Sequence, residues 1–137
     1  MKALKLGFIF IVFACMSIPP AKANSVISKE NKEKVKVYYF HNTRRCMTCN
    51  AVEKVTKEAL KTQFTEELKD GIITFESLNI EEEEGKIAAK KLEVSGQALL
   101  FVSGDKKTDL TTAGFMNAVT KPEKLKAKIK DTVNSML

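Results

Sequence analysis

A strand-like segment, a short polar loop and a Cys-x-x-Cys motif follow one another between residues 35 and 49, and this succession constrains the fold most. Residues 35–40 are rich in β-branched and aromatic side chains, which predicts a strand. The cysteines of the motif are Cys46 and Cys49, and a helical pattern begins at about Met47. We therefore expect an α/β fold in which the cysteine pair opens a helix directly after a strand.

The segments after the cysteines alternate between helical and strand patterns. Apolar residues at three- to five-residue steps predict one helix that ends at Asp70-Gly71; they are Val52, Val55, Ala59, Phe64 and Leu68. Strands are predicted at residues 72–78, 98–102 and 107–112. Two more helices are predicted, a short one through Ile87, Ala88 and Leu92 and a last one with an apolar stripe of Leu125, Ile129 and Val133. The order β-α-β-α-β-β-α gives a right-handed β-α-β unit, a hairpin and a closing helix, hence a four-stranded mixed sheet flanked by helices.

Two of the predicted helices carry capping signals at their start. Asn79 followed by Glu82 has the spacing of a capping box, and Thr120 with Glu123 repeats it around Pro122, which suits a first helical turn. The acidic run at residues 81–84 has two interpretations. It has the composition of a cation site, but acids in a first helical turn also complement the helix dipole, and we favour the second interpretation.

The first 23 residues have the three-part pattern of a secretory signal peptide. Lys2 and Lys5 precede an apolar run, two prolines end it, and Ala21-Lys22-Ala23 supplies small residues before a cleavage point. The run is shorter than the ~20 residues of a membrane-spanning helix. A retained N-terminal anchor and a lipoprotein signal at Cys15 are the alternatives. We predict a signal peptide at 1–23, a flexible leader at 24–34 and one domain at 35–137.

Export places the protein in the periplasm of a host with an outer membrane, and otherwise outside the cell or at its surface. It also changes the meaning of the basic charge. Loss of residues 1–23 removes three of the 23 basic residues and none of the 17 acidic ones, so the net charge falls from +6 to +3. A charge of that size, spread over lysines and glutamates, is typical of a solvated surface, and we expect no nucleic-acid partner.

Residues 41–49 concentrate the chemistry of the chain: the single histidine, both arginines and both cysteines that remain after cleavage. A Cys-x-x-Cys spacing on a helical turn brings two sulfurs within reach of a disulfide. The helix N-terminus, Arg44 and Arg45 all favour a thiolate at Cys46. Such a thiolate attacks a disulfide, and a second thiol resolves the mixed disulfide. The pattern favours Cys46 as the nucleophile and Cys49 as the more buried resolving thiol.

Other uses of these residues stay open. A structural disulfide is one, although so short a loop adds little stability through chain entropy. A metal site is another, but it needs three or four ligands, and His41 is the one obvious addition to the two thiols. His41 also suits a packed position at a strand end, and the arginines suit surface solubility or an acidic partner.

With its elements in this order, the sequence resembles the thioredoxin-like superfamily. The matching features are the strand at 35–40, Cys46-Met47-Thr48-Cys49 at a helix start, Leu78-Asn79-Ile80 followed by acids, and Leu92-Glu93-Val94-Ser95-Gly96 before Leu99-Leu100-Phe101-Val102. Gly114 also falls where thioredoxins commonly carry glycine. The resemblance covers nearly all of residues 35–137. It implies thiol–disulfide exchange, with a loop facing the cysteines that offers backbone groups to an extended substrate.

The sequence departs from the superfamily pattern around the cysteines. Gly96-Gln97-Ala98 replaces the usual cis-proline, so we expect a trans peptide before Ala98. Arg45 stands in place of a common tryptophan, and Met47-Thr48 matches none of the best-known subfamilies. The buried acid of the superfamily has no counterpart, because Tyr39 and Phe40 occupy its region; Glu53 is either a substitute proton acceptor or a solvated helix residue. Candidate substrate-binding residues are Arg45, Met47, Thr48, Gln97 and Ala98.

The sequence thus predicts an exported thiol–disulfide oxidoreductase that cycles Cys46 and Cys49, without a cofactor or a bound metal. Protein thiols or disulfides are the expected partners, with a membrane redox protein as a candidate electron donor. The direction of electron flow and the oligomeric state stay open. One alternative is a non-catalytic module that binds a soft metal or metalloid through both thiols, which His41 and the missing cis-proline favour. A redox-inert scaffold is the other.

Overall fold

The computed structural model describes residues 34–137. The predicted signal peptide at 1–23 lies outside the described residues, as does the predicted leader up to residue 33. Within residues 34–137, no helix is both long enough and apolar enough to cross a membrane.

Residues 34–137 form four strands and five helices. They are β1 (Val35–His41), α1 (Met47–Gln63), α2 (Thr65–Lys69), β2 (Ile73–Asn79), α3 (Glu83–Lys91), β3 (Ala98–Ser103), β4 (Lys106–Asp109), α4 (Thr111–Asn117) and α5 (Pro122–Asn134). The sheet order is β2-β1-β3-β4; β1 is parallel to β2 and antiparallel to β3, and β3 is antiparallel to β4. This four-stranded mixed sheet flanked by helices confirms the predicted fold class.

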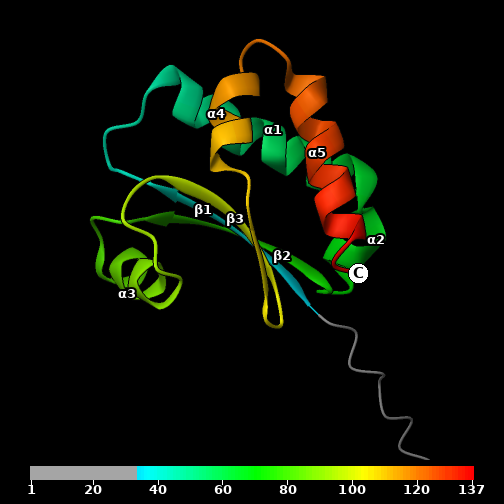
Figure 1. Cartoon of the computed structure of the whole chain (residues 1–137), viewed down its shortest axis with the longest axis horizontal. Coiled ribbons are helices and arrows are strands. Elements are labelled where there is room, and N and C mark those ends of the chain that lie inside the picture. Colours follow the sequence, from blue (N-terminus) through cyan, green and yellow to red (C-terminus); the bar gives the residue numbers. More distant parts are fainter. Residues whose placement is uncertain (1–33) are drawn as a thin grey trace, which may run out of the picture.

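Helices cover both faces of the sheet (Figure 1). Over one face, the first face, lie α1, α2, α4 and α5, whereas α3 covers the second face. Strand β3 shows the division, because side chains alternate along a strand. Leu99 and Phe101 are buried in the core of the first face, and Ala98 and Leu100 in the smaller core of the second.

The single long helix predicted after the cysteines is wrong, because the chain forms two helices there. Phe64, between α1 and α2, has φ −138° and ψ 43°, which lies outside the helical region. The apolar step from Ala59 to Phe64 is five residues, and in a continuous helix it would place the two side chains about 140° apart. By leaving the helical conformation, Phe64 buries its ring in the core of the first face, where it is 4% exposed.

The predicted strand at residues 107–112 is wrong at its C-terminal end. β4 stops at Asp109, and Thr111 begins α4, a helix that the sequence pattern does not predict. Threonine and glycine have low helix propensity, so this segment resembles a strand and a turn. Tertiary contacts override that propensity. The Asp109 carboxylate accepts the Thr111 N–H at 2.7 Å, and Gly114 allows close packing on α1, since a Cβ there would lie 3.2 Å from Val52.

The predicted capping box at Asn79 is wrong. Asn79 is the last residue of β2, and α3 begins at Glu83 with Glu82 as its N-cap. The Asn79 side chain instead accepts the Glu81 N–H and donates to Glu82 Oε1, both at 3.0 Å, and so closes the turn between β2 and α3. Gly85 is buried against this turn, and the position requires glycine because a Cβ there would collide with the Asn79 carbonyl. The dipole interpretation of the acidic run holds for Glu83 and Glu84, which lie in the first turn of α3, whereas Glu81 precedes the helix and accepts the Thr43 N–H at 3.3 Å.

The predicted capping pair at Thr120 is also wrong. Pro122 is the first residue of α5, as predicted, but its N-cap is Lys121, which makes no side-chain hydrogen bond. The Thr120 hydroxyl donates to the Met116 carbonyl at 3.3 Å, so it closes the end of α4 instead. Glu123 forms an ion pair with Lys126 at 2.9 Å within α5. The start of α5 thus depends on burial of its apolar stripe rather than on a capping side chain.

Candidate redox site

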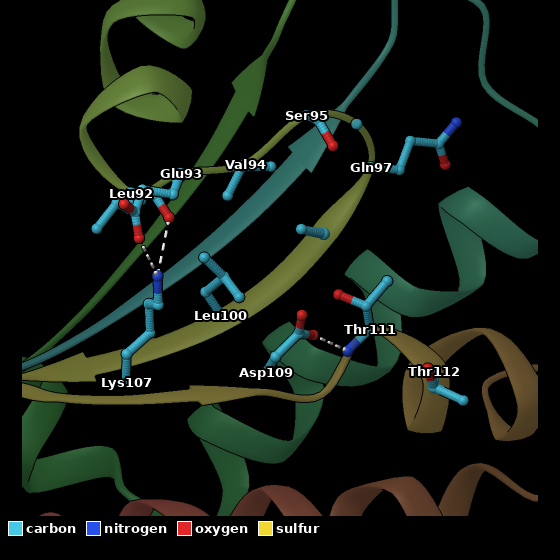
Figure 2. A pocket seen from close by; sticks show the side chains of 12 residues that line it. Leu92, Glu93, Val94, Ser95, Gln97, Leu100, Lys107, Asp109, Thr111 and Thr112 are labelled. Atoms are coloured by element: carbon cyan, nitrogen blue, oxygen red, sulfur yellow. Dashed lines mark hydrogen bonds and ion pairs between the residues drawn. The ribbon is translucent and has the colours of Figure 1, made fainter.

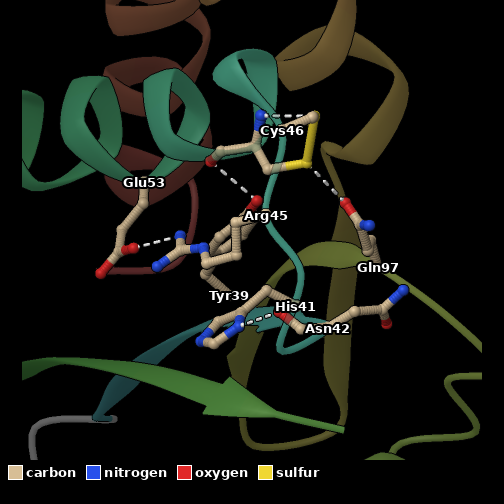
Figure 3. The surroundings of a disulfide bond; sticks show 8 residues. Tyr39, His41, Asn42, Arg45, Cys46, Glu53 and Gln97 are labelled. Carbon is tan, nitrogen blue, oxygen red and sulfur yellow. Dashed lines mark hydrogen bonds and ion pairs between the residues drawn. A yellow bond between two sulfur atoms is a disulfide. The ribbon is translucent and has the colours of Figure 1, made fainter.

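The two cysteines of residues 34–137 form a disulfide at the start of α1 (Figure 3). Cys46 is the N-cap of α1 and is exposed, whereas Cys49 lies in the first turn and is 2% exposed. Their Cα atoms are 5.1 Å apart, and Cys46 Sγ accepts the Cys49 N–H at 3.2 Å. The pair therefore has one sulfur that an incoming molecule can reach and one that the protein encloses.

This placement has a chemical consequence for Cys46. When the disulfide is reduced, the Cys46 sulfur lies at the N-terminus of a helix of 17 residues, where free amides and the helix dipole stabilise negative charge. The Cys49 N–H already points at that sulfur. Cys46 can act as a thiolate nucleophile. Formation of its disulfide with Cys49 is a two-electron oxidation, which reduction of the disulfide reverses.

Tyr39 supports the cysteine pair from below. Its side chain is fully buried, and its hydroxyl donates to the Cys49 carbonyl at 2.8 Å, which ties β1 to the first turn of α1. Burial raises the pKa of Tyr39, and the nearby Arg45 guanidinium opposes this rise without cancelling it. Tyr39 thus stays a hydrogen-bond donor at neutral pH. From the sequence, Tyr39 is expected only to occupy the region of the superfamily's buried acid, and the contact with Cys49 is not predicted. The inward position of Tyr39 on β1 is the signal that points to this contact.

Arg45 lies beside the disulfide but its charge is compensated. The guanidinium is 5.5 Å from the centre of the Tyr39 ring and forms an ion pair with Glu53, and Lys57 donates to the same carboxylate at 2.6 Å. Burial by itself raises the pKa of Glu53, but the hydrogen bonds and charges of Lys57 and Arg45 outweigh it and lower that pKa to about 2. Arg45 therefore adds less to thiolate stability than its position in the sequence predicts.

The role predicted for Glu53 is wrong in both of its versions. The carboxylate is 14% exposed, so Glu53 is not a solvated helix residue. The lowered pKa, about 2 instead of 4.5, also makes the Glu53 carboxylate a weaker base than an ordinary glutamate. Glu53 is therefore a poor proton acceptor at neutral pH. Glu53 instead neutralises and holds Arg45, one turn of α1 beyond Cys49.

The loop before β3 faces the cysteine pair from the strand side. Gln97 Oε1 lies 3.1 Å from Cys49 Sγ (Figure 3). The Ala98 side chain points the other way, into the core of the second face with Phe40 and Leu100, so a substrate can meet only its backbone. Residues 34–137 contain no cis peptide bond, and the bond before Ala98 is trans as predicted.

Comparison with known proteins supports the architecture. No model of a protein family and no curated protein matches the sequence. Among solved structures, oxidised thioredoxin O2 from Arabidopsis thaliana is similar to 72% of this chain over 75% of its own length, with 22% identity and a TM-score of 0.51. A structure described as that of a malarial protein matches 65% of this chain and 97% of its own, with 14% identity and a TM-score of 0.42.

The chain has a thioredoxin-like fold. Its Cys-x-x-Cys pair opens the first helix after the first strand, as the sequence predicted. The thioredoxin-like fold and a pair of cysteines that can form a disulfide support a redox-type thiol module.

Met47, Thr48 and His41 are the remaining candidate residues, and they differ in their position relative to the disulfide of this thioredoxin-like domain. Met47 follows Cys46 and is 76% exposed, and Thr48 is half-buried next to it. His41 lies in β1 with Nδ1 2.9 Å from the Asn42 carbonyl oxygen, and its ring points away from the two sulfurs in Figure 3. Within residues 34–137, no three His, Cys, Asp or Glu side chains form a group that could hold a metal ion.

A groove lies on the other side of the loop that carries Gln97 (Figure 2). We call it the loop groove; residues of the α3–β3 connection, β4 and the start of α4 line it. Lys107 crosses it, donating to the Leu92 carbonyl at 3.1 Å and forming an ion pair with Glu93 at 3.6 Å. In Figure 2 the Gln97 side chain extends away from Lys107 and Asp109, on the opposite side of its loop.

Proposed function

We propose that this protein is an exported thiol–disulfide oxidoreductase that cycles Cys46 and Cys49 between dithiol and disulfide. One observation carries the proposal: an exposed sulfur at the N-cap of α1 is bonded to a sulfur that is enclosed one turn later. A purely structural disulfide gains nothing from this asymmetry. A catalytic pair needs it, because one sulfur must meet the substrate and the other must wait for the intermediate.

The exchange reaction runs in either direction with the same two residues. In reduction, the Cys46 thiolate attacks a substrate disulfide, one substrate sulfur leaves as a thiolate, and Cys46 forms a mixed disulfide. The Cys49 thiolate then attacks Cys46 Sγ, the mixed disulfide breaks, and the second substrate sulfur leaves as a thiolate. The substrate gains two electrons and the protein loses two. Oxidation of a substrate dithiol is the reverse sequence.

The partners follow from this chemistry. Protein thiols or disulfides are the substrates, and a segment that carries the reacting sulfur would pass between the exposed Met47 and the loop of Gln97. Export rests on the pattern of residues 1–23 and places the reaction in the periplasm of a host with an outer membrane, or otherwise outside the cell or at its surface. A membrane redox protein would then exchange electrons with the domain.

The experiment is alkylation of the reduced protein by iodoacetamide as a function of pH, with Cys46→Ser and Cys49→Ser as the matched pair. We expect Cys46 to react with an apparent pKa below the ordinary value of about 8.5, because the helix N-terminus stabilises its thiolate. Cys49 should react more slowly, since it is enclosed. A Cys46 pKa at or above that of a free thiol contradicts the proposal.

A second experiment identifies the partner. Cys49→Ser leaves the mixed disulfide on Cys46 unresolved, so a substrate protein stays covalently attached and can be identified by mass spectrometry after non-reducing electrophoresis. Cys46→Ser is the control, because it retains the buried thiol and lacks the exposed nucleophile. Equal capture by the two variants contradicts the assigned roles.

A further inference from the structure

We propose that Gln97 is a positioning residue for Cys49, whose sulfur it stabilises when that sulfur carries negative charge. The inference rests on the proposed function and adds a residue to it. Cys49 is 2% exposed, so water cannot solvate a thiolate there. Gln97 brings a polar group to this enclosed sulfur, with Oε1 3.1 Å from Sγ.

The amide of Gln97 can serve both protonation states of Cys49. Its oxygen accepts a hydrogen bond from a thiol, and its NH₂ group donates one to a thiolate. A half-turn of the amide exchanges Oε1 and Nε2 without moving the rest of the side chain. An N–H that points at a thiolate makes a charge-assisted hydrogen bond, which is stronger than the bond that the neutral thiol makes. Gln97 therefore favours the charged form of Cys49 whenever that form arises.

Charge arises on Cys49 in the step that makes or breaks its bond with Cys46. When Cys49 resolves a mixed disulfide, its thiolate electron pair forms the new bond to Cys46 Sγ, and the substrate sulfur takes the pair of the broken bond. When a substrate thiolate opens the Cys46–Cys49 bond, Cys49 leaves with that pair. Opening starts from the neutral disulfide, and resolution starts from the neutral thiol wherever Cys49 is protonated, so negative charge on Cys49 grows toward both transition states. Under that condition a donor beside Cys49 accelerates both directions. The first attack by Cys46 places no charge on Cys49.

The fold fixes Gln97 in this position. The next residue, Ala98, is buried in the core of the second face and pairs with Phe40 of β1. After it, the Leu99 N–H donates to Thr111 Oγ1 at 2.9 Å, so the start of β3 is held on both sides. These contacts anchor the two residues that follow Gln97, and the Gln97 side chain is directed at Cys49 (Figure 3). This is a different role from substrate binding, the role that the sequence predicted for Gln97.

The experiment separates the two steps in one trace. Reduced protein is mixed with excess of a symmetric nitrobenzoate disulfide whose released thiolate absorbs visible light. Attack by Cys46 releases the first coloured thiolate, and resolution by Cys49 releases the second. In Gln97→Met, which keeps the length and loses the donor, we expect an unchanged first phase and a second phase about tenfold slower. Gln97→Glu should slow the second phase further and move its pH profile to higher pH, because a carboxylate repels a thiolate.

The matched control is Ser95→Ala, an exposed position in the same loop, for which both phases should stay as in the wild type. Thermal unfolding of the reduced variants checks that each is folded. A second phase in Gln97→Met within about twofold of the wild type overturns the role of Gln97. Equal slowing of both phases overturns it as well, because Gln97 would then act on Cys46 or on the fold. A wild-type protein that shows no first phase overturns the proposed function together with this role.

Discussion

The two faces of the sheet are unequal, and the redox site belongs mainly to the larger one. Among residues 34–137, the core of the first face contains 17 buried residues and that of the second face contains five. Cys49, Tyr39 and Glu53 all lie on the first-face side, supported by α1. The second face contributes the anchor of the opposing loop through Ala98. The first face thus contains most of the buried core and carries the cysteine pair on α1, whereas the second face anchors the loop that brings Gln97 to Cys49.

The largest expected effect is on the free energy of unfolding, and two neighbouring leucines of β3 compare the two cores directly. Leu99 is buried in the first-face core and Leu100 in the second-face core, so Leu99→Ala and Leu100→Ala remove the same atoms from opposite sides. We expect Leu99→Ala to lower the free energy of unfolding by about 4 kcal/mol and Leu100→Ala by about 2 kcal/mol. The thinner layer can collapse onto the smaller side chain, whereas the thicker one retains a cavity. Denaturant unfolding of the oxidised proteins measures both values, and equal losses contradict the comparison.

A smaller effect concerns the partly buried ion pair on the first face. The pKa of Glu53 is lowered from 4.5 to about 2 in the folded protein, so folding favours its ionised form. The stabilisation is complete above pH 4.5 and disappears as the pH falls toward 2, where the folded protein takes up the proton as well. We expect Glu53→Gln to cost about 1–2 kcal/mol at neutral pH, because it leaves Arg45 without its partner.

Urea unfolding at a series of pH values measures this difference. The stabilities of the wild type and of Glu53→Gln should converge as the pH falls from 4.5 to 2. A control is Glu66→Gln, since Glu66 forms an exposed ion pair with Lys69 on α2 and should differ little from the wild type at any pH. A gap between wild type and Glu53→Gln that does not change with pH contradicts the assigned ion pair.

The smallest expected effect lies at the edge of the second face. Glu93, just after α3, has φ 56°, a left-handed conformation that glycine adopts at lower cost. Its ion pair with Lys107 is exposed and contributes little, because the Glu93 side chain is 86% exposed. We expect Glu93→Gly to raise the free energy of unfolding by about 0.5 kcal/mol. Thermal unfolding detects the change, with Glu93→Gln as the control that removes the charge and keeps the strain. A loss of stability in Glu93→Gly contradicts this reading.

The parts of the fold that the sequence predicts are those encoded locally. The β-branched and aromatic residues of β1, the apolar run of β3 and the Cys-x-x-Cys at the start of α1 are visible in short windows, and the structure agrees with the elements predicted from them. The segments that were predicted wrongly depend on distant contacts. Phe64 leaves the helix to reach the core, and α4 forms because Gly114 can approach Val52. No short window contains either cause.

The candidate site divides in the same way. The exposed Cys46 and the enclosed Cys49 follow from position on one helical turn, so the sequence was sufficient. The charge balance was not predictable, because the pairing of Arg45 with Glu53 depends on how the loop meets α1. The contact between Gln97 and Cys49 joins residues 48 positions apart and follows only from the register of β3.

The hydrogen bond from Tyr39 to the Cys49 carbonyl has a consequence for how readily the disulfide closes. Ring closure depends on the effective concentration of one sulfur at the other, and this rises when the linking backbone has few conformations to lose. This hydrogen bond holds the first turn of α1 on the buried strand β1, so Cys49 keeps its position after reduction. Little conformational entropy is then lost when the disulfide re-forms. The protein encloses its resolving sulfur and also keeps it locally concentrated.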